Sequence, residues 1–204
     1  DSVWIGLNSQ YVDSIYWTDN SYSEIDEQYS TVSIYYPIIV RYVGDHSAVA
    51  TSEQDTVISK WNNGPLMRHY KNHTPGYGLV ERYYRKNPSV PSTLYSSVQS
   101  AMNDALPGQI VHVDSGAPTL TTDLFVPCGR TLSIHPGTGE VFADYDIIVR
   151  SGGVVIADSG VILSRNIIYR GQIADGVKWN YPVKIDSSAT VNRGATLTIA
   201  DGVP

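Results

Sequence analysis

Hydrophobic residues and glycines recur at fixed distances in the second half of the chain, from residue 126 onward. In each copy an apolar residue is followed by Gly three positions later, by apolar residues six and eight positions later, and by Gly eleven positions later. Clear copies begin at Val126, Val149 and Val191, and a weaker one begins at Ile168. Successive starts therefore lie 23, 19 and 23 residues apart, within the range of one coil in solenoid proteins.

Each copy predicts a short strand between two turns. In Leu132/Ile134 and Leu197/Ile199 the two apolar residues flank a polar one, so both side chains lie on one face of a strand. Glycine permits the positive φ that a tight corner needs. One coil cannot bury its apolar face alone, so successive coils must stack. The pattern resembles right-handed parallel β-helices of extracellular bacterial proteins, and an antiparallel sandwich with recurring hairpins is the alternative fold.

Residues 1–87 show a different pattern, dense in aromatic and β-branched residues. Strands are expected within 32–43, where Pro37 interrupts the run, and at 46–50, 56–61 and 83–86. We expect these strands to form a small, mostly antiparallel sheet.

Two prolines within residues 87–91 mark a boundary between two domains, 1–87 and 88–204. The predicted fold class is mainly β, with a small α+β module followed by a capped parallel β-helix.

A helix is expected directly after the boundary. Ser92 or Thr93 could cap it, and it ends before Pro107. Four apolar residues at helical spacing share one face: Leu94, Val98, Met102 and Ala105. A strand at 109–113 follows. A short helix ahead of the first coil resembles the N-terminal cap of β-helix proteins.

The other end, at Pro204, follows a repeat directly. We expect the natural protein to continue there, and unpaired strand edges could support self-association.

Composition limits the cellular location of the protein and the classes of partner that it could bind. The net charge is −6 and Lys and Arg form no cluster, which argues against a nucleic-acid partner. No uninterrupted apolar stretch is long enough to span a membrane. Cys128 is the only cysteine, so no internal disulfide can form. Abundant Tyr, Ser, Thr and Asn with few Lys indicate an extracellular or cell-surface protein.

Several short motifs in the first domain occur together. They are Val3-Trp4-Ile5-Gly6, Tyr16-Trp17-Thr18-Asp19, Asp45-His46-Ser47-Ala48, Ser59-Lys60-Trp61, Pro65-Leu66 and His69. This set resembles a family of secreted bacterial proteins that carry the C-terminal half of a papain-like cysteine amidase or peptidase module.

The resemblance implies that His46 is the catalytic base and that Ser59 orients it. The family's nucleophilic Cys precedes the segment matching Val3, whereas this chain begins at Asp1 and Cys128 lies in the second domain. We therefore expect the module to be inactive as it stands or to have its Cys upstream of residue 1.

Other candidate sites rest on weaker patterns. His69 and His73 have the spacing of metal ligands on a helix, but the surrounding residues are typical of a loop. Four acidic residues could hold Ca²⁺ or form a solvated turn: Asp19, Glu24, Asp26 and Glu27. Four others along the solenoid could be catalytic carboxylates or ordinary turn residues: Asp144, Asp146, Asp158 and Asp175. His112 and His135 stand isolated in the sequence and suggest no role. We expect no metal and no cofactor.

Three functions remain open. The first is a cell-surface or matrix protein with a β-helix stalk or adhesive scaffold and a binding or vestigial amidase-like module. The second is a cysteine amidase or peptidase acting on cell-wall peptide. The third is a polysaccharide-processing β-helix enzyme. Cell-wall peptide or polysaccharide is thus the expected partner.

Overall fold

The chain divides into two compact units, Asp1–Asn87 and Pro88–Pro204. The computed structural model describes residues 21–30, 38–43, 46–51, 55–60, 66–72, 78–159, 161, 163, 165–186, 188–201 and 203. The fold is mainly β, with one α-helix among the described residues.

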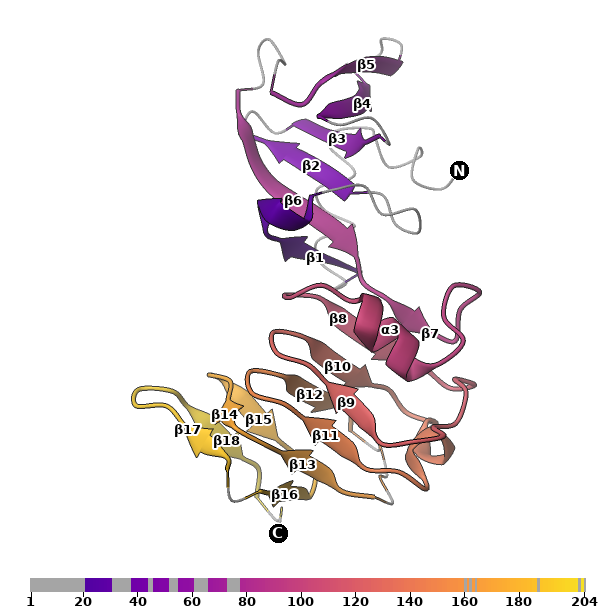
Figure 1. The fold of residues 1–204 in the computed structure, drawn as a ribbon, viewed down its shortest axis with the longest axis vertical. Helices are drawn as coiled ribbons and strands as arrows, with labels where there is room; N and C mark the ends of the chain where they lie inside the picture. The colour runs from indigo at the N-terminus through magenta and orange to yellow at the C-terminus, as the bar shows by residue number, and fades with distance from the viewer. Residues whose placement is uncertain are drawn as a thin grey trace. The chain divides into compact units, whose positions relative to one another are not determined.

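The first unit contains a six-stranded antiparallel sheet (Figure 1). In spatial order its strands are β1 (Tyr22–Ile25), β6 (Val80–Lys86), β2 (Ile38–Tyr42), β3 (His46–Ala50), β4 (Thr56–Lys60) and β5 (Leu66–Tyr70). The antiparallel sheet was predicted, whereas β1 and β5 were not. A 3₁₀ turn, η1 (Glu27–Tyr29), follows β1. The helical part of an α+β module is absent from the part of this unit that the structure describes.

One face of this sheet is closely packed. The register places Val40 opposite both Ala48 and Tyr83, so these side chains share a face, and all three are buried. Val57 on β4 is buried too. Alternating β-branched and small residues fit such a face because they pack well on a pleated surface.

The second unit is a parallel β-solenoid of about five turns (Figure 1). One wall is the sheet β7 (Ser89–Val90), β8 (Ile110–Val113), β10 (Thr131–Ile134) and β12 (Val154–Ala157). A second wall is β9 (Leu124–Val126), β11 (Ile147–Val149), β13 (Ile167–Tyr169) and β16 (Val183–Ile185). Two shorter parallel pairs complete the later coils: β14 (Gln172–Ile173) with β17 (Thr190–Val191), and β15 (Val177–Trp179) with β18 (Leu197–Ile199).

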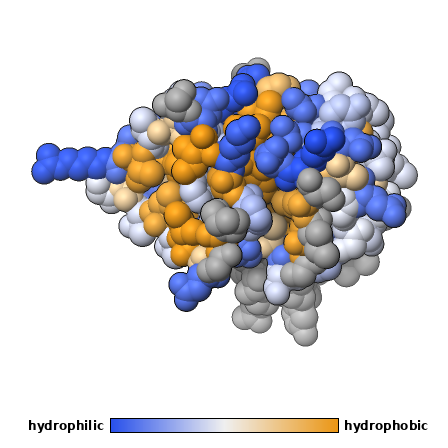
Figure 2. All heavy atoms as spheres, turned by 90° about the horizontal axis from the view of Figure 1, so that it is seen from below, coloured by the Kyte–Doolittle hydropathy of each residue, from blue (hydrophilic) through white to orange (hydrophobic). Residues whose placement is uncertain are grey.

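The repeat positions fall where the sequence predicts. Leu132 pairs with Val155 and Ile134 pairs with Ala157, and all four side chains are buried inside the coil. The equivalent Ile199 in the last repeat is 54% exposed. Figure 2 views the molecule from the end that carries the last coils, and hydrophobic surface is visible there between polar side chains.

The repeat glycines form the predicted corners. Gly129 has φ +70° and Gly152 has φ +74°, a backbone conformation that disfavours side chains. The Gly129 amide donates a 2.9 Å hydrogen bond to the Gly152 carbonyl, so consecutive corners also stack on one another.

The cap helix α3 (Val98–Asp104) exists but starts later than predicted. Its N-cap is Ser97, whose side chain accepts from the Ser100 amide while the Ser100 hydroxyl accepts from the Ser97 amide. Leu94 lies outside the helix and is 41% exposed. The helix therefore begins where these reciprocal hydrogen bonds form, and not where the apolar spacing begins.

Candidate functional site

Polar side chains from three successive coils meet on the outer face of the β8–β10–β12 wall. His112 lies on β8 between two inward-facing valines, so its side chain faces out. His135 and Asp158 directly follow β10 and β12. Their amides donate to Val113 and Ile134 respectively, each at 3.0 Å, which extends the ladder to these two residues.

The three side chains form a continuous hydrogen-bonded line. Nδ1 of His135 lies 2.7 Å from Oδ2 of Asp158, and its Nε2 lies 3.1 Å from Nδ1 of His112. A carboxylate only accepts, so Nδ1 of His135 carries the hydrogen. In the neutral ring Nε2 then accepts from the Nδ1–H of His112. The carboxylate thereby determines the tautomers of both histidines.

The line is accessible from outside. The side chain of His135 is 29% exposed and that of Asp158 is 45% exposed. The two imidazole planes are inclined by only 12°, with centroids 5.4 Å apart. Nearly parallel planes suit a hydrogen bond between ring nitrogens because the nitrogen lone pair lies in the plane of its ring.

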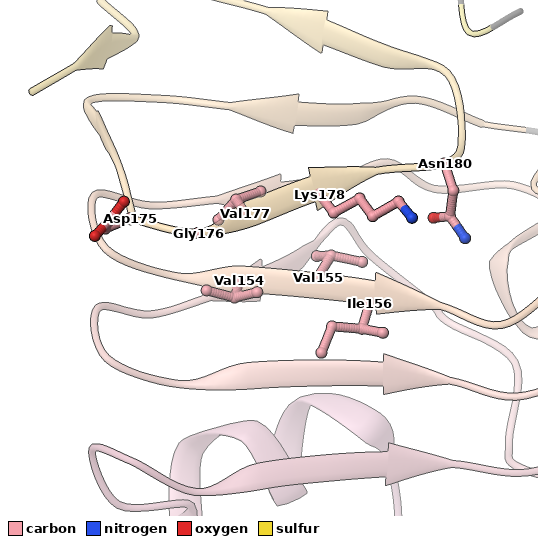
Figure 3. A pocket seen from close by; sticks show the side chains of 8 residues that line it. All are labelled: Val154, Val155, Ile156, Asp175, Gly176, Val177, Lys178 and Asn180. Carbon is pink, nitrogen blue, oxygen red and sulfur yellow. The ribbon is translucent and has the colours of Figure 1, made fainter. Parts of the chain in front are cut away.

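A pocket of about 280 Å³ opens beside β12, the strand that leads to Asp158 (Figure 3). Its residues come from β12 and from the segment containing β15: Val154, Val155, Ile156, Asp175, Gly176, Val177, Lys178 and Asn180. Ile156 lies two residues before Asp158 and is 46% exposed. The pocket therefore offers apolar surface beside an ammonium group and a carboxamide.

The pocket exists because the wall opens between β12 and β15. These strands are the edges of two different sheets, so no ladder joins them in the described chain. The backbone groups of Val155 on this unpaired edge instead form hydrogen bonds with two tyrosine hydroxyl groups inside the coil. Tyr181 donates to its carbonyl at 2.6 Å, and its amide donates to Tyr169 at 3.4 Å.

Two polar residues at the pocket have fixed partners. The side-chain Nδ2 of Asn180 donates to the Ala157 carbonyl at 2.8 Å, and Oδ1 of Asp175 accepts from the backbone amide of Thr196 at 2.7 Å. Behind the pocket, burial raises the pKa of Tyr181 strongly, which keeps its hydroxyl a donor.

The residues predicted for catalysis lie in the first unit. His46 begins β3 opposite Tyr42, and its side chain lies outside the described part. Ser59 is fully buried on β4, with its Oγ 2.8 Å from Nε2 of His69. Nδ1 of His69 lies 3.0 Å from the Tyr70 carbonyl and donates to it, so the Ser59 hydroxyl donates to Nε2. The pairing of Ser59 with His46 stays a prediction.

The other candidates have structural partners. His69 lies on a strand, β5, and not on a helix, while His73 lies outside the described residues. Of the acidic cluster, Asp19 is also outside them, Asp26 caps η1, Glu24 pairs with Arg82 and Glu27 accepts from Tyr83.

The solenoid carboxylates divide in the same way. Asp146, directly before β11, accepts from Asn166, and Asp175, in a turn, accepts from the Thr196 amide. Asp158 contacts His135. No group of three or more His, Cys, Asp or Glu suited to a metal occurs among the described residues.

The sequence analysis missed the contact between His112 and His135. Steps of 23 residues separate His112, His135 and Asp158, close to the repeat length. The pairing of Ile110 with Thr131 shows, however, that the first coil is 21 residues long, so His112 is offset by two positions. The spacing was thus a usable signal, but only with the coil length known.

No protein family, curated protein or solved structure matches this chain. None of the helices in the described part is long and apolar enough to cross a membrane.

Proposed function

We propose that this is an extracellular cell-surface or matrix protein whose solenoid is a rigid scaffold that binds polysaccharide along its outer wall. The observations that carry the proposal are the pocket between β12 and β15 and the line His112–His135–Asp158, whose last residue follows β12. Together they offer ammonium, carboxamide, imidazole and carboxylate groups next to exposed Ile156.

The arrangement of these groups suits an extended ligand. Neighbouring strands lie about 4.8 Å apart, so each coil presents its side chains one step further along the solenoid axis. A chain of sugar rings has hydroxyl groups and apolar ring faces at every unit. A ligand lying along the axis would therefore meet a polar group from each successive coil and apolar surface at Val154 and Ile156.

Binding fits the pocket better than cleavage does. Glycoside hydrolysis usually needs two carboxyl groups flanking the bond that breaks. Asp175 is the one carboxylate that lines the pocket, and it accepts from the Thr196 amide, while Asp158 is paired with His135. The polysaccharide-processing enzyme accordingly ranks behind the scaffold.

A glycan-binding experiment tests the proposal. The full chain is applied to an array of bacterial and plant polysaccharides, and hits are measured by calorimetry. Lys178→Ala should weaken binding about tenfold or more, the usual effect of losing a hydrogen bond from a charged group. Lys184→Ala removes an exposed lysine from β16 on another wall and should leave affinity unchanged.

The outcomes separate the competing functions. No polysaccharide bound above background, or equal losses in both lysine variants, would refute the proposed wall. Release of new chain ends during incubation would instead favour the polysaccharide-processing enzyme.

The cysteine amidase or peptidase is the second candidate. The part-buried hydrogen bond between Ser59 and His69 supports it, because it places a polar pair on the sheet that carries His46. Mapping alkylated peptides of the naturally expressed protein tests this candidate. A labelled Cys ahead of Asp1, with cell-wall peptide hydrolysis lost in His46→Ala, is the expected result. A natural protein with no such Cys would exclude it.

A further inference from the structure

We infer that His112 and His135 form a binding site for one divalent transition-metal ion, with Asp158 holding His135 in the required orientation. The site lies on the outer wall of the solenoid and does not depend on polysaccharide binding. The polysaccharide test uses lysine variants and leaves all three of these residues intact.

The facing nitrogens have a separation suited to a shared ion. Nδ1 of His112 and Nε2 of His135 are 3.1 Å apart. Two nitrogens on one tetrahedral zinc ion, each about 2.0–2.1 Å from the metal, lie about 3.3 Å from each other. The N–H of His112 and the lone pair of His135 now point along the line between the nitrogens, whereas a tetrahedral ion lies off that line. An ion can thus replace the shared hydrogen once each ring tilts by roughly 35° with little change in the separation of the nitrogens.

Asp158 occupies the position of an outer carboxylate in histidine–metal sites. Metal-binding histidines usually donate their second N–H to a carboxylate or carbonyl, which fixes the ring and makes the ligand nitrogen more basic. The 2.7 Å contact between His135 Nδ1 and Asp158 Oδ2 has this form. It leaves Nε2 of His135 with its lone pair directed at His112.

His112 must change tautomer when the ion binds. Its hydrogen now lies on Nδ1, between the two rings, and would move to Nε2 as Nδ1 coordinates the metal. Both rings stay neutral, so ion binding at neutral pH releases no proton from the pair. A solvent-exposed wall allows this transfer through water.

The ligand set determines the class of ion. Imidazole nitrogens suit Cu²⁺, Ni²⁺ and Zn²⁺, with Cu²⁺ bound most tightly, whereas Ca²⁺ and Mg²⁺ take oxygen ligands. No third His, Cys, Asp or Glu completes a metal group among the described residues. Water would fill the remaining positions, and the partial exposure of His135 allows it to do so.

Titration of the full chain with Zn²⁺ or Cu²⁺ tests this site, using calorimetry in a non-coordinating buffer at pH 7.5. We expect one ion per chain above the background of a His112→Gln/His135→Gln double variant. Either single Gln variant should reduce binding to that background. Asp158→Asn should weaken it about 10–100-fold, the usual effect of losing an outer carboxylate. Asp201→Asn, a matched change at an exposed carboxylate, should have no effect.

Two spectroscopic measurements identify the ligands. Electron paramagnetic resonance of the Cu²⁺ form should show coupling to two nitrogens, reduced to one or none in His112→Gln. Nitrogen chemical shifts of His112 should change from the Nδ1–H to the Nε2–H tautomer on adding Zn²⁺.

Binding no tighter than in the double variant would overturn the inference, provided that circular dichroism shows the variants folded. Full affinity in either single variant would overturn it as well, because the ion would then bind elsewhere. Equal affinity for Ca²⁺ would contradict the imidazole ligands.

Discussion

Replacing Tyr181 by Phe tests whether the tyrosine hydroxyl stabilises the solenoid where no backbone ladder joins β12 to β15. The Tyr181 hydroxyl is buried and donates to the Val155 carbonyl at 2.6 Å. Phe keeps the ring and removes only this donor. The carbonyl then remains buried without its partner, which costs about 1–3 kcal/mol of the free energy of unfolding.

Urea denaturation can measure such a loss. Domains of this kind unfold with a free energy of about 5–15 kcal/mol. With a urea dependence of about 1–3 kcal/mol per molar, the expected loss lowers the midpoint by roughly 1 M. Trp179 is the only tryptophan after residue 87, is buried, and lies 5.0 Å from Tyr169 by ring centroids. Its indole N–H resonance, once assigned among those of the four tryptophans, therefore reports on this coil.

Tyr145→Phe is the matched control. Tyr145 is partly exposed, so water can hydrogen-bond any group that loses the tyrosine hydroxyl as its partner. We expect its midpoint to change by less than about 0.3 M, as for a surface substitution. If Tyr181→Phe unfolds at the wild-type midpoint, the hydroxyl does not replace the missing ladder and the reasoning fails.

Alkaline pH provides a second measurement on the same residue. Burial raises the pKa of Tyr181 strongly, so the folded protein keeps this proton while an unfolded tyrosine loses it near pH 10. The unfolded state then binds fewer protons than the folded one, and the unfolding free energy falls as pH rises. Above about pH 10 Tyr181 should contribute a loss of about 1.4 kcal/mol per pH unit, absent in Tyr181→Phe. An identical slope in both proteins would contradict the assignment.

Two further substitutions test the packing of each unit. Gly153→Ala would place a Cβ 2.9 Å from the Val126 carbonyl oxygen, so we expect about 1–3 kcal/mol of destabilisation in urea; an unchanged midpoint would show that the corner can relax. Ser59→Ala removes the part-buried hydrogen bond to His69 and should lower stability by about 0.5–1.5 kcal/mol. The His69 nitrogen shifts should change with it, and unaltered shifts would argue against the hydrogen bond.

The sequence was sufficient to predict the solenoid because its core obeys a simple rule. Alternation at Leu132/Ile134 and glycine at the corners determine which side chains point inward and where the chain turns, independently of the neighbouring coils. The predicted start of the cap helix was wrong because several serines precede the helix and each could be its N-cap. The choice of Ser97 depends on its reciprocal hydrogen bonds with Ser100, which the apolar pattern does not reveal.

The candidate site could not be predicted from any single segment, because it depends on the lengths of two successive coils. His112 meets His135 only because the first coil is 21 residues long and the next is 23, which sets the offset between their strands. Strand β5 was missed for a related reason. A turn signal, Asn63-Gly64-Pro65, precedes Leu66–Tyr70, but the segment lacks strict alternation, and its pairing with β4 is a property of the whole sheet.

The pocket and the stability of the solenoid share one cause. An uninterrupted ladder between β12 and β15 would satisfy Val155 by backbone hydrogen bonds and bring the two strands too close to leave a cavity. Tyr169 and Tyr181 satisfy this edge from inside, so the strands stay apart without leaving its polar groups unpaired. Substitutions at Lys178 should accordingly change ligand affinity and leave stability unchanged, whereas Tyr181→Phe should change both. Loss of affinity in Tyr181→Phe with full stability would mean that the hydroxyl acts on the ligand and not on the wall.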